Sequence, residues 1–152
     1  MIHKIDFFNI CNTLVEENIT SLSSSISEIK NDLNSATKSS AGDKHEVGRA
    51  MMHIELEKQS KHLSELNKSQ QTLHLISLEV NLKHNQIKLG SLVLLCNNQL
   101  YYISLSLGKL IAEDKEFYAI SPITPLASLL LNKKVNDIID FRGQKLTIKE
   151  LY

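Results

Sequence analysis

Two carboxylates in the first third of the chain stand at a spacing that could do chemistry. Asp43 and Glu46 are three residues apart, so on a helix their side chains share one face. At a helix start, the same Asp-x-x-Glu spacing is also a capping box, in which the aspartate accepts backbone N–H groups and the glutamate reaches back. Lys38, Lys44 and Arg49 surround the pair and fit either contact with nucleic-acid phosphates or a solvated helix face. The spacing alone leaves a functional pair and a helix cap both open.

Other reactive side chains form no recognisable motif. Five histidines follow one another at spacings of 8, 9, 12 and 10 residues, so no two stand one helical turn apart as zinc ligands would: His45, His53, His62, His74 and His84. Cys11 and Cys96 match no CxxC or zinc spacing, and we expect reduced core thiols rather than a disulfide. The sequence has no Gly-rich phosphate loop and no Cys/His or Ser/His pair at a motif spacing for nucleophilic catalysis.

Composition and charge exclude several classes of protein. Seventeen basic and seventeen acidic residues give no net charge, so non-specific nucleic-acid binding is not expected. We also expect no sequence-specific binding to DNA. The longest apolar run, Leu92–Cys96, is too short to span a membrane. Residues Met1–Cys11 are interrupted by Asp6 and Asn9 and lack a small-residue cleavage site, so they are not expected to be a signal peptide. The sequence predicts a cytoplasmic protein without a membrane anchor.

Long helices must position the acidic pair. The first 89 residues contain two glycines and no proline, whereas the remaining 63 contain three glycines and both prolines. Apolar residues recur at alternating spacings of four and three, as in a coiled-coil seam: Val15, Ile19, Leu22, Ile26, Ile29, Leu33 and Ala36. After Lys38–Gly42 the stripe restarts at Val47, Met51 and Ile54 and continues, with a shifted phase, through Leu56, Leu63, Leu66 and Leu73.

This pattern predicts an antiparallel helical hairpin over about residues 13–81, with its loop at 39–42. Gly48 would cost about 1 kcal/mol inside a helix relative to alanine, which favours a second helix that begins after it. The apolar segments Met1–Cys11 and Leu73–Leu82 would form the base of the hairpin. We predict a hairpin domain at residues 1–85, with its tip at about 39–46.

The second half of the sequence has the residue pattern that is typical of β-strands. Five segments rich in Leu, Ile, Val, Tyr and Phe are predicted as strands: Ser91–Cys96, Leu100–Ser106, Glu116–Ser121, Val135–Phe141 and Lys145–Leu151. Asn97-Asn98 and Arg142-Gly143 are typical of tight turns. Thr124 as N-cap, Pro125 at the first position and Asn132 at the end predict one short helix between the third and fourth strands. The fold class is therefore α+β, with a small antiparallel sheet domain and one short helix at residues 86–152.

This order of elements resembles the bacterial Gre family of transcript-cleavage factors, which join a helical hairpin to a small FKBP-like domain. Leu89-Gly90-Ser91-Leu92-Val93 is similar to the family's Phe-Gly-Ser-x-Val. Residues Ser121–Asp137 resemble its Ser-Pro-hydrophobic-Ala…Leu…Gly-Lys-x-x-Gly-Asp stretch, with Asn132 and Asn136 in place of the two glycines. The closing Leu146–Leu151 resembles its final strand. These motifs run through nearly the whole second domain, in order.

The resemblance extends to the tip of the hairpin. Gly42-Asp43-Lys44-His45-Glu46 is similar to the family's Gly-Asp-x-x-Glu, but Arg49 stands where the family has an acidic residue. The resemblance to the Gre family implies a hairpin that enters the secondary channel of RNA polymerase. Asp43 would be the ligand nearest a Mg²⁺ shared with the polymerase, and Glu46 would orient the ion or its water.

The resemblance also implies how the chain would work with its partner. The ion would activate water to cut backtracked RNA, so the chain would stimulate the polymerase's own hydrolysis and would not be an enzyme by itself. It would act as a monomer, with Lys38, Lys44 and Arg49 near the 3′ end of the nascent RNA. The second domain would grip the polymerase through Pro122, Thr124, Pro125, Leu126, Ala127, Lys133 and Lys134.

Three alternatives stay open. Arg49 fits a Gre-like regulator that occupies the channel without promoting cleavage. The FKBP-like fold also occurs in prolyl isomerases, but these need an aromatic-lined pocket and this chain has no tryptophan. A structural coiled-coil adaptor explains the hairpin and leaves the motifs of the second domain without a role.

Overall fold

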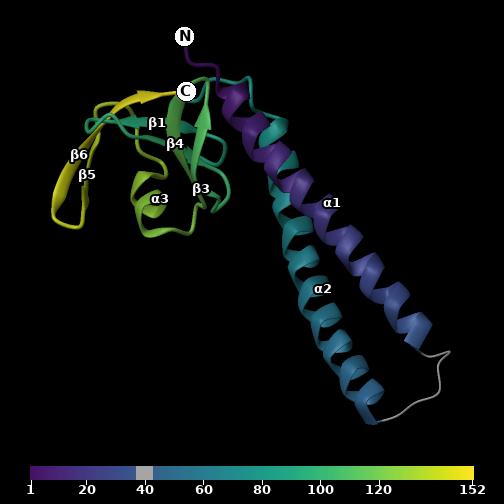
Figure 1. Cartoon of the computed structure of the whole chain (residues 1–152). Helices are drawn as coiled ribbons and strands as arrows, with labels where there is room; N and C mark the ends of the chain where they lie inside the picture. The colour runs from purple at the N-terminus through teal and green to yellow at the C-terminus, as the bar shows by residue number, and fades with distance from the viewer. Residues whose placement is uncertain (37–42) are drawn as a thin grey trace. The chain divides into compact units, whose positions relative to one another are not determined.

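The computed structural model describes the backbone of residues 1–36 and 43–152 and the side chains of residues 1–35 and 46–152. Two long helices are followed by four strands, a short helix and two strands (Figure 1). The predicted α+β class is confirmed. The predicted loop at 39–42 lies outside the described residues.

Contacts divide the chain into two compact units, residues 1–13 with 71–152 and residues 14–70. We call them the sheet unit and the hairpin unit. The domain boundary that we predicted between residues 85 and 86 falls inside the sheet unit, since the first turns of one helix and the last turns of the other belong to it.

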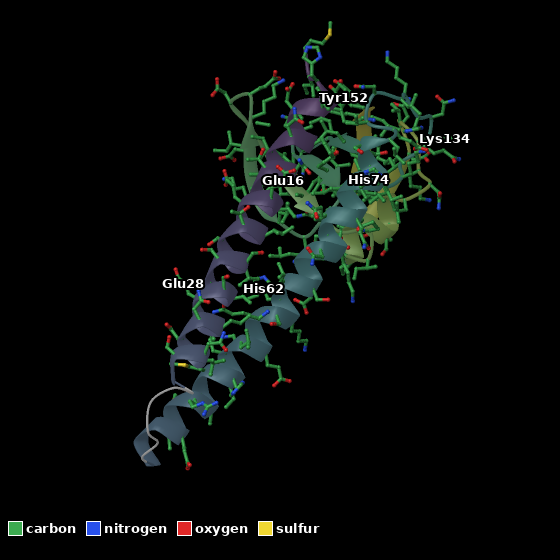
Figure 2. The ribbon with its side chains drawn as sticks, turned by 90° about the vertical axis from the view of Figure 1, so that its right-hand side faces the viewer. Glu16, Glu28, His62, His74, Lys134 and Tyr152 are labelled. Atoms are coloured by element: carbon green, nitrogen blue, oxygen red, sulfur yellow. The ribbon has the colours of Figure 1, made fainter. Side chains whose placement is uncertain are left out.

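Helices α1 (Lys4–Ala36) and α2 (Asp43–Ser77) form the hairpin unit over residues 14–70. The predicted seam on α1 is confirmed: its members Val15, Ile26 and Leu33 are buried, and Ile19, Leu22 and Ile29 are half-buried. Polar side chains cover the outer faces of both helices, including the labelled Glu28 and His62 (Figure 2). The hairpin therefore buries a narrow stripe and exposes the rest.

The apolar stripe predicted for the start of α2 is wrong. Val47, Met51 and Ile54 are 62%, 67% and 67% exposed, so they do not continue the seam. The inward face of α2 is instead half-buried, at spacings of four and three: Met52, Leu56, Gln59, Leu63 and Leu66. The predicted continuation of the stripe is confirmed, since Leu56, Leu63 and Leu66 are half-buried and Leu73 is buried. Only the first part, Val47 to Ile54, followed the wrong face. The expected start after Gly48 is also wrong, because α2 begins at Asp43.

The sheet has six strands in the order β3-β4-β2-β1-β6-β5. Their bounds are β1 Leu92–Leu95, β2 Leu100–Ile103, β3 Gly108–Ala112, β4 Lys115–Ile120, β5 Ile138–Phe141 and β6 Gln144–Leu151. Five of them match the predicted strands, and β3 was missed. The predicted all-antiparallel sheet is wrong, because β2 and β4 pair in parallel.

Tight turns join three pairs of strands. Asn98 after β1 has φ of 62°, and Arg142 and Gly143 between β5 and β6 have φ of 53° and 79°, so both predicted turns are confirmed. The third turn, between β3 and β4, has Glu113 at 48° and Asp114 at 61°. This Glu-Asp pair is an unusual choice for two positive φ values, which explains why the hairpin was not predicted.

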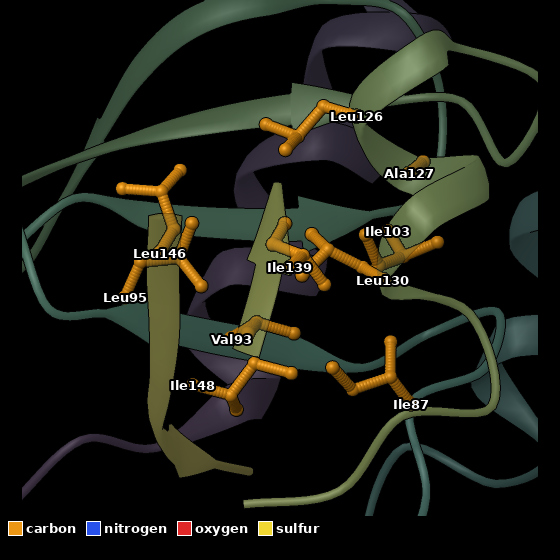
Figure 3. Packing of buried hydrophobic residues seen from close by; sticks show 10 residues of the cluster. All are labelled: Ile87, Val93, Leu95, Ile103, Leu126, Ala127, Leu130, Ile139, Leu146 and Ile148. Atoms are coloured by element: carbon orange, nitrogen blue, oxygen red, sulfur yellow. The ribbon is translucent and has the colours of Figure 1, made fainter. Parts of the chain in front are cut away.

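Helix α3 (Pro125–Leu130) packs on one face of the sheet. Its side chains Leu126, Ala127 and Leu130 meet the inward side chains of β1, β2, β5 and β6 in one cluster (Figure 3). The members from the strands are Val93, Leu95, Ile103, Ile139, Leu146 and Ile148, and Ile87 joins them from the preceding segment.

The base of the helices contributes the second core of the sheet unit. The ring of Phe7 on α1 meets that of Phe117 on β4 edge-on, with centroids 4.9 Å apart, and Phe117 in turn meets Tyr102 on β2. Lys4, Phe7, Cys11 and Val15 are all buried, at spacings of three, four and four. Because this stripe continues the seam, α1 begins at Lys4 rather than near residue 13.

Both cysteines are free. Cys11 is buried, as we predicted for a core thiol, and burial raises its pKa to about 11. Cys96 is exposed, contrary to that prediction, because it follows the last residue of β1 at the turn. Within the described parts of the chain, no helix is long and apolar enough to cross a membrane.

Candidate functional site

The acidic pair lies at the start of α2. Asp43 and Lys44 are its first two residues, but their side chains, and Lys38 altogether, lie outside the described residues. Glu46 is described, and its side chain is exposed. The carboxylate of Glu46 is therefore open to solvent within the first helical turns of α2, at the end of the hairpin unit.

Arg49 has a different environment from Glu46. Its side chain is half-buried and lines a hollow of about 280 Å³ together with Leu33 of α1 and His53 of α2. The structure gives no ion pair between Glu46 and Arg49, both of whose side chains it describes. The arginine stem packs toward the seam, as long basic side chains often do, and makes no ion pair with Glu46.

Residues 121–128 form a hydrogen-bonded turn that leads into α3. The Thr124 hydroxyl donates to the Ser121 carbonyl at 2.8 Å, and the Thr124 N–H donates to the same oxygen at 3.0 Å. The Ser128 N–H donates to the Thr124 carbonyl at 2.9 Å. Thr124 is the N-cap residue and Pro125 occupies the first turn, as predicted, although the Thr124 hydroxyl makes no capping bond to the helix.

The turn after α3 depends on two asparagines in the left-handed region. Asn132 has φ of 66° and Asn136 has φ of 74°. The Asn132 N–H donates to the Ile87 carbonyl at 2.8 Å, and the Asn136 N–H donates to the Ile148 carbonyl at 2.8 Å. The Asp137 carboxylate accepts the Lys134 N–H at 2.7 Å. Lys133 and Lys134 are exposed (Figure 2 labels Lys134). The hydrogen bonds fix the backbone of their segment at both ends.

The predicted docking residues fall into two groups. Pro125, Lys133 and Lys134 are exposed, and Pro122 and Thr124 are partly exposed. Leu126 and Ala127 are buried in the core under α3, so in this fold they position the segment and do not present side chains to a partner. Only five of the seven predicted residues can therefore form a surface.

Sequence reasoning missed the most exposed apolar residue of this segment. Ile123 is 89% exposed, between Pro122 and Thr124. Its N–H donates to the Ser121 hydroxyl at 3.5 Å, so the backbone below it is held in place. An isoleucine placed between Pro122 and Thr124 in a turn was a signal, because a solvated turn has no need of a large apolar side chain.

The described residues have limited capacity to bind a metal. No group of three or more His, Cys, Asp or Glu side chains comes together in the described part of the chain. Asp43 and Glu46 supply carboxylate oxygens, which are the ligands that Mg²⁺ takes, but two carboxylates leave most of its coordination to water or to another molecule. Of the predicted pair only the side chain of Glu46 is described, and one carboxylate supplies too few ligands to hold the ion alone.

Comparison with known proteins gives no further identification. No protein-family model matches the chain, and no curated protein matches it.

Proposed function

We propose that this chain is a Gre-like transcription elongation factor. It binds bacterial RNA polymerase in the cytoplasm as a monomer, with the hairpin in the secondary channel and the sheet unit docked at the channel rim. Asp43 and Glu46 help to hold a Mg²⁺ at the active site of the polymerase, and the polymerase then cleaves backtracked RNA. The chain is an accessory factor and has no hydrolytic activity alone.

One observation carries the proposal. The two positions at which this chain departs from the glycines of the family's pattern, Asn132 and Asn136, both have positive φ. Asparagine is the residue other than glycine that most readily adopts this conformation. The departures thus preserve the backbone that the glycines would give, which supports a common structure for the Ser121–Asp137 segment.

The exposed part of the same segment supports docking. Ile123 offers an apolar anchor, and Lys133 and Lys134 offer positive charge on a fixed backbone. Interfaces depend on a few buried anchors surrounded by polar contacts, and complementary charge speeds the encounter. We propose an acidic rim on the polymerase as the surface that these residues meet.

The tip is suited to a shared metal. Glu46 is exposed and unpaired with Arg49, so its carboxylate remains available. A two-metal centre stabilises both the attacking and the leaving oxygen of a phosphodiester, and the polymerase supplies the remaining ligands. The carboxylates of this chain therefore orient an ion or its water and need not bind an ion alone.

Cleavage of the transcript in stalled elongation complexes tests the metal role. Asp43→Asn keeps the helix cap, because asparagine caps about as well as aspartate, but removes the charge. We expect Asp43→Asn and Glu46→Gln each to abolish stimulated cleavage, while both proteins still bind polymerase. Glu57→Gln, at an exposed acid further along α2, is the matched control and should cleave normally. Normal cleavage by Asp43→Asn would show that the pair is only a capping box.

Arg49 favours a second candidate, a channel-binding regulator that does not promote cleavage, because the family has an acid at this position. Arg49→Asp separates the two. If the wild type cleaves weakly, we expect the substitution to increase cleavage, since it adds a third carboxylate near the tip. If neither protein cleaves while both compete with a cleaving factor for the polymerase, the regulator is the correct function.

A further inference from the structure

A cavity of about 600 Å³ lies in the sheet unit, between the start of α1, the segment after α2 and the end of β6. Ile2, Val80, Leu82 and Leu151 contribute apolar side chains to its lining. Tyr152, labelled in Figure 2, lies on the same wall. The volume is in the range of small-molecule sites, about 300–1,000 Å³, which are mostly apolar with a few polar groups.

The main polar group on the wall is a buried ammonium. Lys4 is only 9% exposed, and its Nζ donates to the Leu82 carbonyl at 3.0 Å. Burial, and then the charge of Lys88, lower the pKa of Lys4. No carboxylate with a described side chain forms an ion pair with it. Glu79 acts on Lys4 through its charge but forms no ion pair with it. A buried cation without a directly paired anion is costly, so Lys4 would gain free energy from an anion in the cavity.

The surroundings of Lys4 are also positive. Lys83 and His84 line the cavity, and Lys88 is close enough to lower the pKa of both Lys4 and His84. The opposing carboxylate is Glu79, which accepts a hydrogen bond from Lys88 and lies 3.6 Å from His84 Nε2. Glu79 therefore already interacts with Lys88 and His84, and burial lowers the pKa of His84.

Two further groups near the cavity leave the net charge around it positive. The Glu150 carboxylate accepts the hydroxyl of Tyr152. The first residue of α1 is Lys4 itself, so the positive end of the helix dipole faces the same region. Positive groups therefore outnumber the carboxylates around an apolar cavity.

We propose that this cavity binds a small organic anion, one with a phosphate or carboxylate head and an apolar body. The head would pair with Lys4 and Lys83, and His84 would donate a hydrogen bond when it carries the proton on the nitrogen facing the ligand. The body would lie against Val80 and Leu151. The site shares no residue with the tip or the docking segment, although His84 and Asn85 also line a neighbouring hollow with Asn132 and Lys134. Its proposed ligand does not depend on the proposed role in transcription.

Titration of the full chain with matched probes tests the site. Phenyl phosphate and phenylacetate carry the two possible heads on a similar body, phenol lacks the charge and inorganic phosphate lacks the body. We expect saturable chemical-shift changes at residues 1–5 and 80–85 with at least one of the two aromatic anions, and weaker or no binding of phenol and inorganic phosphate. The tighter of the two anions identifies the head. If neither aromatic anion gives saturable changes in these residues, the proposal is wrong.

Substitutions distinguish a built site from general attraction of anions. Lys4→Met should weaken binding at least about tenfold, since it removes a charged hydrogen bond. Lys83→Gln, at an exposed residue whose loss should not affect folding, should weaken binding about threefold. Lys145→Gln, also exposed but away from the cavity, is the control and should bind like the wild type. Equal weakening by Lys83→Gln and Lys145→Gln would overturn the proposal, even if Lys4→Met failed to fold.

Discussion

The sheet unit and the hairpin unit differ most in how completely they bury their apolar side chains. In the sheet unit, Phe7, Phe117 and Tyr102 are fully buried in contact with one another, and a second cluster fills the space under α3. In the hairpin unit, half of the described seam residues of α1 remain partly exposed. The same chain therefore contains one well-packed region and one thin, mostly solvated region.

This difference indicates that the two units have different roles. Stabilisation by burial scales with the apolar area removed from water, so the sheet unit supplies most of it. The hairpin unit places α2 residues such as Glu46 far along the helix from the core that stabilises it, at a rise of about 1.5 Å per residue. Exposed Val47, Met51 and Ile54 on α2 add nothing to the fold.

The largest contrast should come from truncating one side chain in each unit. Phe117→Ala should lower the free energy of unfolding by about 3–5 kcal/mol, because the ring is fully buried against Phe7 and Tyr102. Leu22→Ala, in the half-buried seam, should cost less than about 2 kcal/mol. Urea unfolding followed by circular dichroism measures both. Equal losses would show that the hairpin is as well packed as the sheet unit.

A dependence on pH should be specific to the sheet unit. The pKa of Cys11 is raised by burial from 9.0 to about 11, so between these values the unfolded thiol loses its proton and the folded thiol keeps it. Cys11 therefore makes stability fall as the pH rises, by up to about 1.4 kcal/mol per pH unit, whereas the lowered pKa of Lys4 acts in the opposite direction below 10.5. Tyr102 acts in the same direction as Cys11, because burial raises its pKa too.

Paired variants check the origin of this pH effect. Cys11→Ala should reduce the slope of unfolding free energy against pH in this range, whereas Cys96→Ala should not, since Cys96 is exposed. An unchanged slope in Cys11→Ala would mean that the buried thiol does not control it.

Backbone conformation gives a smaller effect in the docking segment. Asn132→Ala should cost about 1 kcal/mol, because alanine has no side chain that favours φ of 66°. Asn132→Gly should be close to neutral or slightly stabilising. Thermal unfolding of the two variants measures this difference. Equal unfolding midpoints for Asn132→Ala and Asn132→Gly would remove the support that backbone conformation gives to the resemblance to the Gre family.

The smallest change is expected in the hairpin unit. Gly48 lies inside α2, and a Cβ there would meet no atom within 4 Å. Gly48→Ala should therefore stabilise the helix by about 0.5–1 kcal/mol. If it stabilises the fold but reduces RNA cleavage, the glycine serves close approach to the nucleic acid. A loss of stability would contradict the helical environment of Gly48.

Local patterns predicted much of the fold. The seam of α1 followed from the spacing of Val15 to Leu33, and the turns at Asn98 and at Arg142-Gly143 followed from residues that adopt positive φ. Five strands followed from their β-branched and aromatic residues. The α+β class could therefore be predicted from the spacing of apolar residues and from the turn residues.

Features that depend on partners distant in the sequence were not predictable. The parallel pairing of β2 with β4 depends on where β3 lies, and β3 was hidden by the Glu113-Asp114 turn. The inward face at the start of α2 was misjudged because Val47, Met51 and Ile54 are apolar but exposed, whereas its continuation through Leu56, Leu63 and Leu66 was predicted. The site was predicted in part: the exposure of Lys133 and Lys134 agrees with a docking surface, whereas Ile123 could be ranked only once its exposure was known.

The central claim is that the sheet unit docks on RNA polymerase, and equilibrium binding of core polymerase to the full chain at low salt tests it most directly. The docking variant Lys133→Glu/Lys134→Glu and the control Lys145→Glu/Lys149→Glu change the charge equally, at exposed positions of the same unit. We predict that the wild type binds, that the docking variant binds at least about tenfold more weakly, and that the control stays within about threefold of the wild type. Failure of the wild type to bind, or equal loss in both variants, would contradict the claim.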